Sequence, residues 1–315
     1  MRRQAQWKSQ MNNLFTIKRP SRLRAVMATT VVLPLLALLA ACGSGTDNKS
    51  SASAPSTAVD SKAAGLLPDS IKSSKVLRVA IPTNEPPTQY YKEGTKEMTG
   101  INPDIARLIG AALGVDVQIE VANFDSIIPG LAAGRYDMTV SSMTPTAERM
   151  KVLEFVDYLS IGNSIAVAKG NPVGVKDEHG LCGKRVGFLT ASYQLTTHVP
   201  EYNKECAGKG AKDIATFQYQ DTRQAISALT SGRLDAVLAD SPIMGYAATQ
   251  NPQIEVVANY GVDPVGVGMP KSSGLIKAVG PAVAAVIKSE GYTKVLSTYG
   301  IQSAAITDAR VNFAQ

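Results

Sequence analysis

Residues 131–142 read LAAGRYDMTVSS, and residues 229–240 read LTSGRLDAVLAD. Each stretch is typical of a helix end, a glycine that terminates the helix, an Arg-x-Asp turn, an apolar strand and a polar exit. A second pair of similar stretches, RVAIPT at 78–83 and RVGFLT at 185–190, precedes the first pair in the same order. Two pairs in one order indicate a repeated unit, so the sequence predicts two similar α/β lobes.

Short β runs alternate with amphipathic helices around these stretches. Asn102 and Pro103 are typical of a helix N-cap and the first helical position, and apolar residues at helical spacing follow as far as Gly114. Asp125 is expected to cap a short helix that ends near Leu131. Strands are expected at 76–82, 115–121 and 136–140. This alternation predicts an α/β fold with largely parallel sheets.

The two lobes predict where a ligand binds. In open α/β sheets, ligands bind beyond the carboxyl ends of the strands, and interfaces between domains are preferred small-molecule sites. If the lobes face each other, the polar exits of four strands line one cleft. These exits are 83–87, 141–146, 191–194 and 240–242.

The net charge of +6 arises in the N-terminal 41 residues. Seven of the 32 basic residues lie there and none of the 26 acidic ones, so residues 42–315 carry 25 basic and 26 acidic groups. That balance gives no overall field to attract a polyanion, which excludes nucleic acid as a partner. The apolar stretch 25–39 is shorter than the about 20 residues that a membrane span needs. Together with the preceding basic residues, it predicts an export signal at 1–41.

The sequence Leu39-Ala-Ala-Cys42 resembles the bacterial lipoprotein box, in which the cysteine becomes the lipidated first residue. A lipid anchor at Cys42 is therefore expected; the alternative is ordinary signal-peptide cleavage that leaves this thiol free. Residues 42–70 are rich in Gly, Ser and Ala and are predicted to form a flexible tether. The folded domain is expected to start near residue 71.

The chain has three cysteines and two histidines, which offers little for a metal site, and no cofactor is expected. The export signal places Cys182 and Cys206 in an oxidising compartment, which favours a disulfide between them. Two buried free thiols are the alternative.

Six motifs in order resemble those of bacterial solute-binding proteins of family 3, the polar-amino-acid receptors of ABC importers. They are LRVAIPTNEPP at 77–87, TGINPDIA at 99–106, DSIIPGL at 125–131 with GRYD at 134–137, SSMTPTAER at 141–149 with FVDY at 155–158, GRLDAVLAD at 232–240 and GYTKVLSTYG at 291–300. The resemblance implies two Rossmann-like lobes joined by two hinge strands. It places lobe 1 at 71–161 and 262–303, the inserted lobe 2 at 162–261, and the hinges at 161–168 and 256–263.

The resemblance also assigns two charged residues to the ligand's backbone groups. Arg149 matches the arginine that clamps the α-carboxylate, which suits a planar fork that makes two parallel hydrogen bonds. Thr144 and Pro145 are expected to start a helix whose free N–H groups favour that anion. Asp240 matches the aspartate that accepts the α-ammonium. The alternatives are a solvated arginine and an aspartate that caps the helix starting at Ser241.

Polar and apolar residues complete the implied site. Ser142 and Thr144 match positions that bond the ligand's amino and carboxylate groups, and Ser141 lies at the same strand exit. Ser192 replaces the usual Thr in the lobe 2 loop and keeps a hydroxyl. Phe124 matches an apolar contact to the ligand's side chain, with simple core packing as the alternative. Ala191 stands where the family usually has Gly, which restricts that turn.

Glu85 is the main departure from the family pattern and the main indication of the ligand. A buried carboxylate needs a cationic or strong donor partner, because an unpaired one costs several kcal/mol. This favours a ligand with a positive distal group, such as arginine, lysine or ornithine. An ectoine-like compatible solute is an alternative, because some of its receptors resemble the Asn-Glu-x-Pro turn at 84–87. An exposed Glu85 at the cleft rim is the other.

The resemblance implies a monomeric receptor rather than an enzyme. It would be lipid-anchored on the outer face of a cell membrane, bind an amino acid between closing lobes and deliver it to ABC permease subunits. A dehydratase-type enzyme on the same fold and a sensing subunit without transport are the alternatives. The chain has no S-x-x-K, G-x-S-x-G or P-loop motif, and both Arg149 and Asp240 suit an intact zwitterion.

Overall fold

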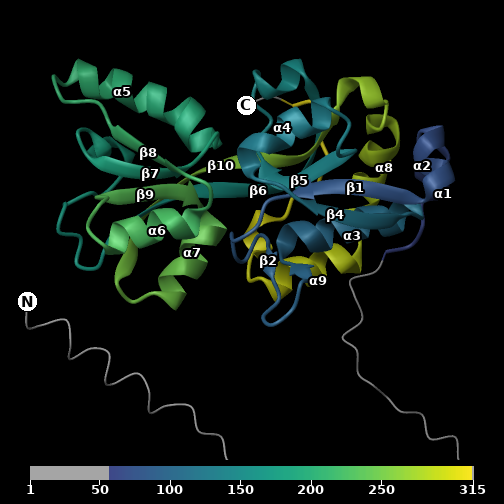
Figure 1. The fold of residues 1–315 in the computed structure, drawn as a ribbon, viewed down its shortest axis with the longest axis horizontal. Helices are drawn as coiled ribbons and strands as arrows, with labels where there is room; N and C mark the ends of the chain where they lie inside the picture. Colours follow the sequence, from purple (N-terminus) through teal and green to yellow (C-terminus); the bar gives the residue numbers. More distant parts are fainter. Residues whose placement is uncertain (1–56, 314–315) are drawn as a thin grey trace, which may run out of the picture. The chain divides into compact units, whose positions relative to one another are not determined.

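The computed structural model describes residues 57–313 (Figure 1). The predicted signal peptide, the lipidation site Cys42 and the first part of the predicted tether lie outside the described residues. Within 57–313 no helix is long and apolar enough to cross a membrane.

The described residues form one large mixed sheet with two halves. Its strand order is β4-β1-β5-β10-β6-β9-β7-β8. The strands are β1 (Val76–Ile81), β4 (Asp116–Val121), β5 (Met138–Met143), β6 (Leu153–Ala168), β7 (Arg185–Leu189), β8 (Ala215–Tyr219), β9 (Ala236–Asp240) and β10 (Ile254–Pro270), and a separate hairpin pairs β2 (Tyr90–Tyr91) with β3 (Met98–Thr99). β1 pairs in parallel with β4 and β5, and β7 pairs in parallel with β8 and β9.

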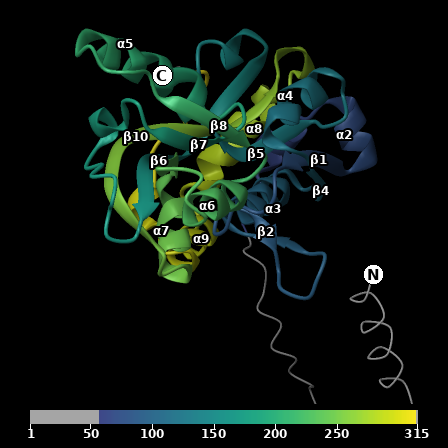
Figure 2. The same ribbon diagram turned by 60° about the vertical axis from the view of Figure 1, so that its left-hand side comes forward.

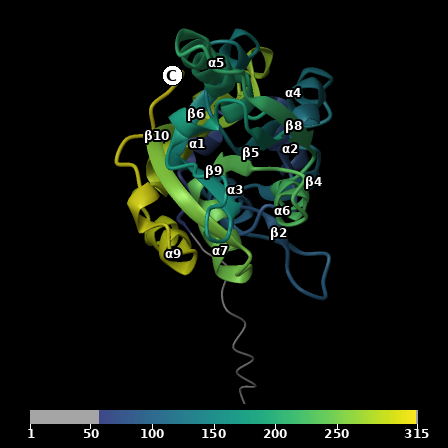
Figure 3. The same cartoon turned by 90° about the vertical axis from the view of Figure 1, so that its left-hand side faces the viewer.

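The long strands β6 and β10 join the two halves. They pair antiparallel along nearly their whole length; Figure 1 shows them passing from one half of the sheet to the other, and Figure 3 shows them side by side. The predicted α/β fold, with two lobes joined by two hinge strands, is therefore confirmed. The residue boundaries of the lobes stay a prediction, because β6 and β10 run without a break through the proposed boundaries at 161 and 262.

Helices cover both faces of each half. They are α1 (Ser61–Gly65), α2 (Asp69–Ser74), α3 (Ile101–Leu113), α4 (Phe124–Ala132), α5 (Val199–Gly208), α6 (Thr222–Thr230), α7 (Ser241–Gln250), α8 (Ile276–Val286) and α9 (Glu290–Thr298), with 3₁₀ turns η1 (Arg149–Lys151), η2 (Glu178–Leu181), η4 (Lys271–Ser273) and η5 (Gln302–Ala304) and a π-helical turn η3 (Gln194–His198). α5 lies on one face of β7 and β9, and α6 and α7 lie on the opposite face (Figures 1 and 2). α3, α8 and α9 contribute to the main core of lobe 1, and α4 covers its other face.

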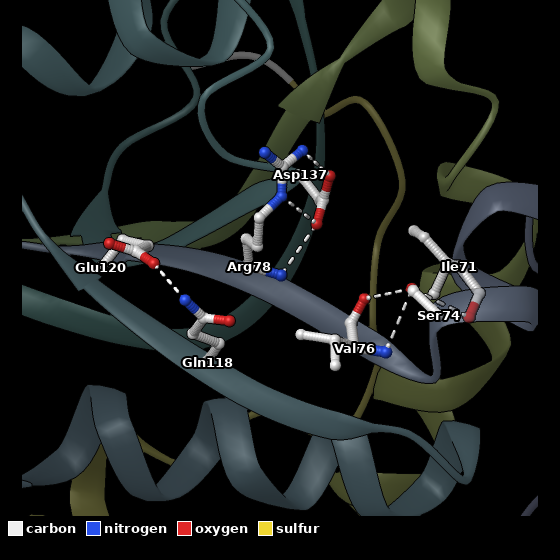
Figure 4. Close-up of polar contacts among 7 residues, drawn as sticks. All are labelled: Ile71, Ser74, Val76, Arg78, Gln118, Glu120 and Asp137. Atoms are coloured by element: carbon white, nitrogen blue, oxygen red, sulfur yellow. Dashed lines mark hydrogen bonds and ion pairs between the residues drawn. The ribbon is translucent and has the colours of Figure 1, made fainter.

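The repeat seen in the sequence corresponds to one Arg–Asp pair in each lobe, called a clamp here, in which the arginine makes three hydrogen bonds to the carboxylate. Arg78, at the start of β1, donates its backbone N–H, Nε and Nη2 to the carboxylate of Asp137 at 2.8, 3.2 and 2.7 Å (Figure 4). Arg185, at the start of β7, makes the same three bonds to Asp235 at 2.7, 3.3 and 2.8 Å. Each clamp fixes the first strand of its lobe to the neighbouring parallel strand, β5 or β9.

Two predicted helix starts are wrong. α3 begins at Ile101 after Gly100, whose φ of 118° suits glycine, and a Cβ there would lie 2.7 Å from the carbonyl oxygen of Thr88. Asn102 is instead fully buried, and its Oδ1 accepts from the Tyr158 hydroxyl at 2.6 Å. α4 begins at Phe124 with Asn123 in the cap position, so the predicted cap Asp125 lies in the first turn.

The predicted tether extends too far along the chain. Asp60 caps α1 by accepting hydrogen bonds from the backbone N–H groups of Lys62 and Ala63. Ala63 and Leu67 are buried in the main core of lobe 1. Composition missed this because two small helices need only a few apolar residues when a preformed surface buries them. The folded domain therefore starts before residue 71.

The predicted disulfide is present. Cys182 follows η2 and Cys206 lies in α5, and their sulfur atoms are bonded. The bond joins the segment before β7 to the helix after it.

Candidate functional site

A cavity lies where the carboxyl ends of β1, β5, β7 and β9 meet, as the strand exits predict. Its walls include all eight residues predicted to bind a ligand: Glu85, Phe124, Ser141, Ser142, Thr144, Arg149, Ser192 and Asp240. Both lobes contribute, so the site lies between them.

Arg149 is a buried cation in this cavity. It follows β5 in the turn η1 and is 8% exposed, so it is not a solvated arginine. Nη1 donates to the carbonyl of Thr144 at 2.8 Å and Nη2 donates to the carbonyl of Ala191 at 2.9 Å. Burial lowers the pKa of Arg149 to about 10, so the guanidinium stays charged at neutral pH. Two of its five N–H groups are thus engaged, and the rest make no hydrogen bond to described protein atoms.

The predicted helix at Thr144 and Pro145 is absent from the described chain. The residues after β5 form an irregular loop and then a single 3₁₀ turn. The guanidinium is held by two carbonyl groups instead, one from each lobe. Its face also lies near the ring of Phe124, with Cζ 5.5 Å from the ring centroid. Phe124, the first residue of α4, therefore packs in the core that this helix covers and also forms part of the cavity wall.

Asp240 faces the cavity from the end of β9. It occupies the N-cap position of α7, but its side chain makes no capping hydrogen bond. Its Oδ1 accepts from Nε2 of Gln194 at 2.7 Å. Burial raises the pKa of Asp240 to about 6, and the bond from Gln194 opposes this rise. The side chain is therefore mainly an anion at neutral pH and is not used as a helix cap.

Glu85 is buried in the same cavity, with 1% of its surface exposed. The alternative of an exposed rim residue is thus wrong. Oε1 accepts from the backbone N–H of Thr222 at 2.6 Å, at the N-terminus of α6, where a carboxylate is favoured. Oε2 has no hydrogen-bond partner among the described residues. Burial raises the pKa of Glu85 to about 8, against the lowering effect of Thr222.

The four hydroxyl residues are all near the cavity, but their roles in the protein differ. Ser142 has φ of 52°, and its backbone N–H donates to the Tyr158 hydroxyl at 2.9 Å. The Ser141 Oγ accepts from Thr139 at 2.9 Å. The Ser192 Oγ accepts from the backbone N–H of Leu195 at 3.3 Å. Thr144 uses its carbonyl to hold Arg149, and its hydroxyl makes no hydrogen bond to described protein atoms.

Direct contacts join the two walls of the cavity. The guanidinium of Arg149 reaches Ala191 in the opposite wall, and Glu85 reaches Thr222 in the same way. At the edge, Nδ2 of Asn84 donates to Asp221 at 3.4 Å. The lobes are therefore closed on each other in this structure.

Other cavity residues were not among the eight predicted ligand residues. They are Pro82, Thr88, Gln89, Leu189, Tyr193, Gln194, Thr222, Ala239 and Ile243. Gln194 lies within the predicted exit 191–194, so its position was a usable signal. Thr222 follows no predicted strand exit and enters only because α6 points its N-terminus at the cavity. Within 57–313 no group of three or more His, Cys, Asp or Glu side chains is placed to hold a metal ion.

Comparison with known proteins identifies the family. The model of the bacterial extracellular solute-binding proteins, family 3, matches residues 77–302. The chain belongs to this family. The cavity between the strand exits is therefore the part of a solute-binding protein where a solute is expected.

Individual relatives are named as binding proteins for amino acids. The chain is 27% identical over 249 residues to the arginine-binding protein ArgT of Corynebacterium glutamicum, covering 78% of this chain and 81% of the relative. It is 27% identical over 240 residues to the L-cystine-binding protein TcyA of Bacillus subtilis, covering 76% of this chain and 82% of the relative. A solved structure described as an ancestral arginine-binding protein bound to arginine superposes with a TM-score of 0.65 at 30% identity, covering 71% of this chain and 98% of that one.

Proposed function

We propose that this solute-binding protein binds an amino acid with a positively charged side chain between its lobes. Arg149 would bind the α-carboxylate, Asp240 the α-ammonium and Glu85 the distal cation. The hydroxyl groups of Ser141, Ser142, Thr144 and Ser192 and the ring of Phe124 would complete the contacts. We further propose that the protein is lipid-anchored at Cys42 on the outer face of a cell membrane and delivers its ligand to an ABC permease.

The observation that carries the proposal is the set of three buried ionisable side chains in one cavity. One cation and two carboxylates complement a ligand with one carboxylate and two cationic groups. The free Oε2 of Glu85 makes this specific, because a buried acceptor without a partner is costly and a distal cation would satisfy it. The names of two relatives, which concern arginine, support the same class of ligand.

Two alternatives have support of their own. The turn at 84–87 resembles that of some ectoine receptors, but an ectoine-like zwitterion has no second cationic group for Glu85. The relative named for binding L-cystine supports a polar ligand whose distal end, with one ammonium and one carboxylate, carries no net charge. A catalytic function is not proposed, because Arg149 and Asp240 together suit retention of an intact amino acid.

Arginine and citrulline provide the test, since they have nearly the same shape and differ in the charge of the distal group. We expect calorimetry to show that arginine binds at least about tenfold more tightly, and that the preference grows from pH 6 to pH 9 as Glu85 ionises. Lysine and ornithine should bind as well, and an ectoine should not. Equal affinity for arginine and citrulline across this range would contradict a cationic ligand. Binding of ectoine alone would contradict an amino acid ligand altogether.

A further inference from the structure

A chain of side-chain hydrogen bonds leads from Asp240 to the two long strands. Nε2 of Gln194 donates to Oδ1 of Asp240 at 2.7 Å and to Oδ1 of Asn163 at 2.8 Å. Nδ2 of Asn163 then donates to Oδ2 of Asp263 at 3.1 Å. Asn163 lies on β6 and Asp263 on β10, so the chain of bonds connects the cavity to both strands that join the lobes.

The direction of these bonds is fixed by chemistry. Both partners of the Gln194 amide nitrogen are oxygen acceptors, and its two hydrogens serve one acceptor each. Reversing the Gln194 amide would place its oxygen against the Asp240 carboxylate. Reversing the Asn163 amide would place its oxygen against the carboxylate of Asp263. The carboxylate at each end therefore holds both amides in one orientation.

The strands are shaped to bring Asp263 to this position. The pairing of β6 with β10 shifts register between Tyr260 and Asp263, which indicates a bulge. Gly261, inside the bulge, has φ of 62°. At the facing position, a Cβ on Gly162 would lie 2.7 Å from the carbonyl oxygen of Gly261, so only glycine allows this approach.

Asn163 is not a cavity residue. It is 2% exposed and does not contribute to the cavity wall, whereas Gln194 and Asp240 do. A ligand in the cavity would reach Asn163 only through Gln194. Asn163 also lies directly opposite Asp240 in the pairing of β6 with β9, and a substitution that keeps this backbone pairing would act on ligand affinity through the side-chain hydrogen bonds.

We propose that Gln194 and Asn163 are positioning residues, which hold the Asp240 carboxylate toward the ligand and couple its position to the conformation of β6 and β10. The inference rests on the proposed function, in which Asp240 accepts the ligand's ammonium. Opening or closing of the lobes at these strands would then change the orientation of Asp240 as well as its distance from Arg149. The site would be fully formed only in the closed arrangement of the strands.

The charges around Asp240 give the proposal a pH signature. The bond from Gln194 and the charge of Arg149 lower its pKa, and the negative charge of Asp263 raises it. Glu85 lines the same cavity as Asp240, and beside burial the charge of Asp240 raises the pKa of Glu85 and of Tyr158. Loss of Gln194 should thus move the acidic limb of ligand binding to higher pH, because the ammonium needs the carboxylate. Loss of the Asp263 charge should move it to lower pH.

The experiment measures the dissociation constant of arginine from pH 5 to pH 9 for wild type, Asn163→Ala, Gln194→Ala, the double variant and Asp263→Asn. We expect Asn163→Ala to weaken binding about tenfold, although this residue cannot touch the ligand. We expect the double variant to bind like Gln194→Ala alone. The acidic limb should move upward for Gln194→Ala and downward for Asp263→Asn. Asp263→Asn keeps an oxygen that can accept from Asn163, so it tests the signature with little change in packing.

The control is Gln118→Ala, because Gln118 also donates to a carboxylate, that of Glu120, but on exposed β4 (Figure 4). It should leave both affinity and pH profile unchanged. Wild-type affinity for Asn163→Ala, or effects of Asn163→Ala and Gln194→Ala that multiply in the double variant, would overturn the inference. Failure of the wild type to bind any amino acid would instead overturn the proposed function.

Discussion

The two lobes are alike at one end of their sheets and different at the other. At the amino ends, Arg78 with Asp137 and Arg185 with Asp235 make the same three hydrogen bonds. At the carboxyl ends, β5 carries Ser142 while β9 ends at Asp240 in the corresponding position. The amino ends only align strands, so the same Arg–Asp hydrogen bonds are sufficient in both lobes. The carboxyl ends face the cavity, where each lobe supplies a different group.

The difference between the exits gives the cavity its polarity. The cation of the site, Arg149, comes from the loop after β5 in lobe 1. The anion Asp240 comes from lobe 2. A zwitterion placed between them contacts both only when the lobes are closed, which is the condition for a ligand to shift the equilibrium toward closure.

The largest effect is predicted for variants that remove one of the two charges that would hold the zwitterion. Arg149→Ala leaves the ligand's α-carboxylate, and Asp240→Ala its α-ammonium, without a charge partner in the closed cavity, which should cost about 3–5 kcal/mol, or at least about 10²-fold to 10³-fold in affinity. The melting temperature without ligand should stay within a few degrees of wild type. Calorimetry and thermal denaturation test both statements. Arg135→Ala, which removes an exposed arginine, is the matched control and should bind normally.

The next effect concerns the distal charge. Glu85→Gln should weaken binding of arginine by about tenfold to a hundredfold and change the affinity for citrulline little, because only arginine loses a charge partner. Calorimetry with both ligands measures the ratio. An equal loss for the two ligands would show that Glu85 acts on the cavity as a whole.

Glu85 also predicts a proton exchange on binding. Its pKa is about 8 in the closed form, above the ordinary value of 4.5. Its contribution to closure without a ligand is therefore fully present below pH 4.5 and is lost as pH rises through about 8. A cationic ligand reverses this preference by stabilising the carboxylate. Arginine binding near pH 7 should therefore leave the carboxylate ionised, whereas closure over citrulline should take up a proton, which calorimetry in buffers of different ionisation enthalpy detects.

Substitutions in the two Arg–Asp clamps should lower stability and leave ligand affinity unchanged, whereas substitutions at the strand exits should do the opposite. Asp137→Ala or Asp235→Ala removes the acceptor for a backbone N–H and for an arginine side chain, so Asp137→Ala should lower the free energy of unfolding by about 1 kcal/mol and Asp235→Ala, in the exposed clamp, by less. Both should leave the affinity for arginine within about twofold. Denaturant unfolding and calorimetry make the comparison. A large loss of affinity in either variant would mean that the amino ends also shape the cavity.

The smallest effect concerns Ala191, which has φ of 60° and supplies a carbonyl to Arg149. Ala191→Gly relieves a left-handed conformation that is costly for alanine but adds freedom to the unfolded chain, so we expect a net gain of about 0.5 kcal/mol. Ala207→Gly, at an exposed position in α5, should instead destabilise by up to about 1 kcal/mol. Thermal denaturation separates the two signs; destabilisation by Ala191→Gly would show that this turn is not strained.

The sequence was informative where local pattern and the repeat agree. The strand exits predicted the cavity, and the family motifs brought all eight proposed ligand residues to it. The partner of Glu85 was not predictable, because Thr222 is 137 positions away and depends on how α6 meets the opposite lobe. The same holds for Gln194 and Asn163, whose bond depends on where β6 crosses between the lobes. The cap of α3 was missed because tertiary contacts drew Asn102 into the core.

The most direct test of the account removes each charge from the protein and its proposed partner from the ligand. Arginine, agmatine without the α-carboxylate and 5-guanidinopentanoate without the α-amino group are titrated into wild type, Arg149→Ala and Asp240→Ala. The account predicts that Arg149→Ala weakens arginine strongly but agmatine little, and that Asp240→Ala weakens arginine strongly but 5-guanidinopentanoate little. If each variant weakens all three ligands by the same factor, these residues do not bind the groups assigned to them, and the proposed binding of one ligand by charges from both lobes is wrong.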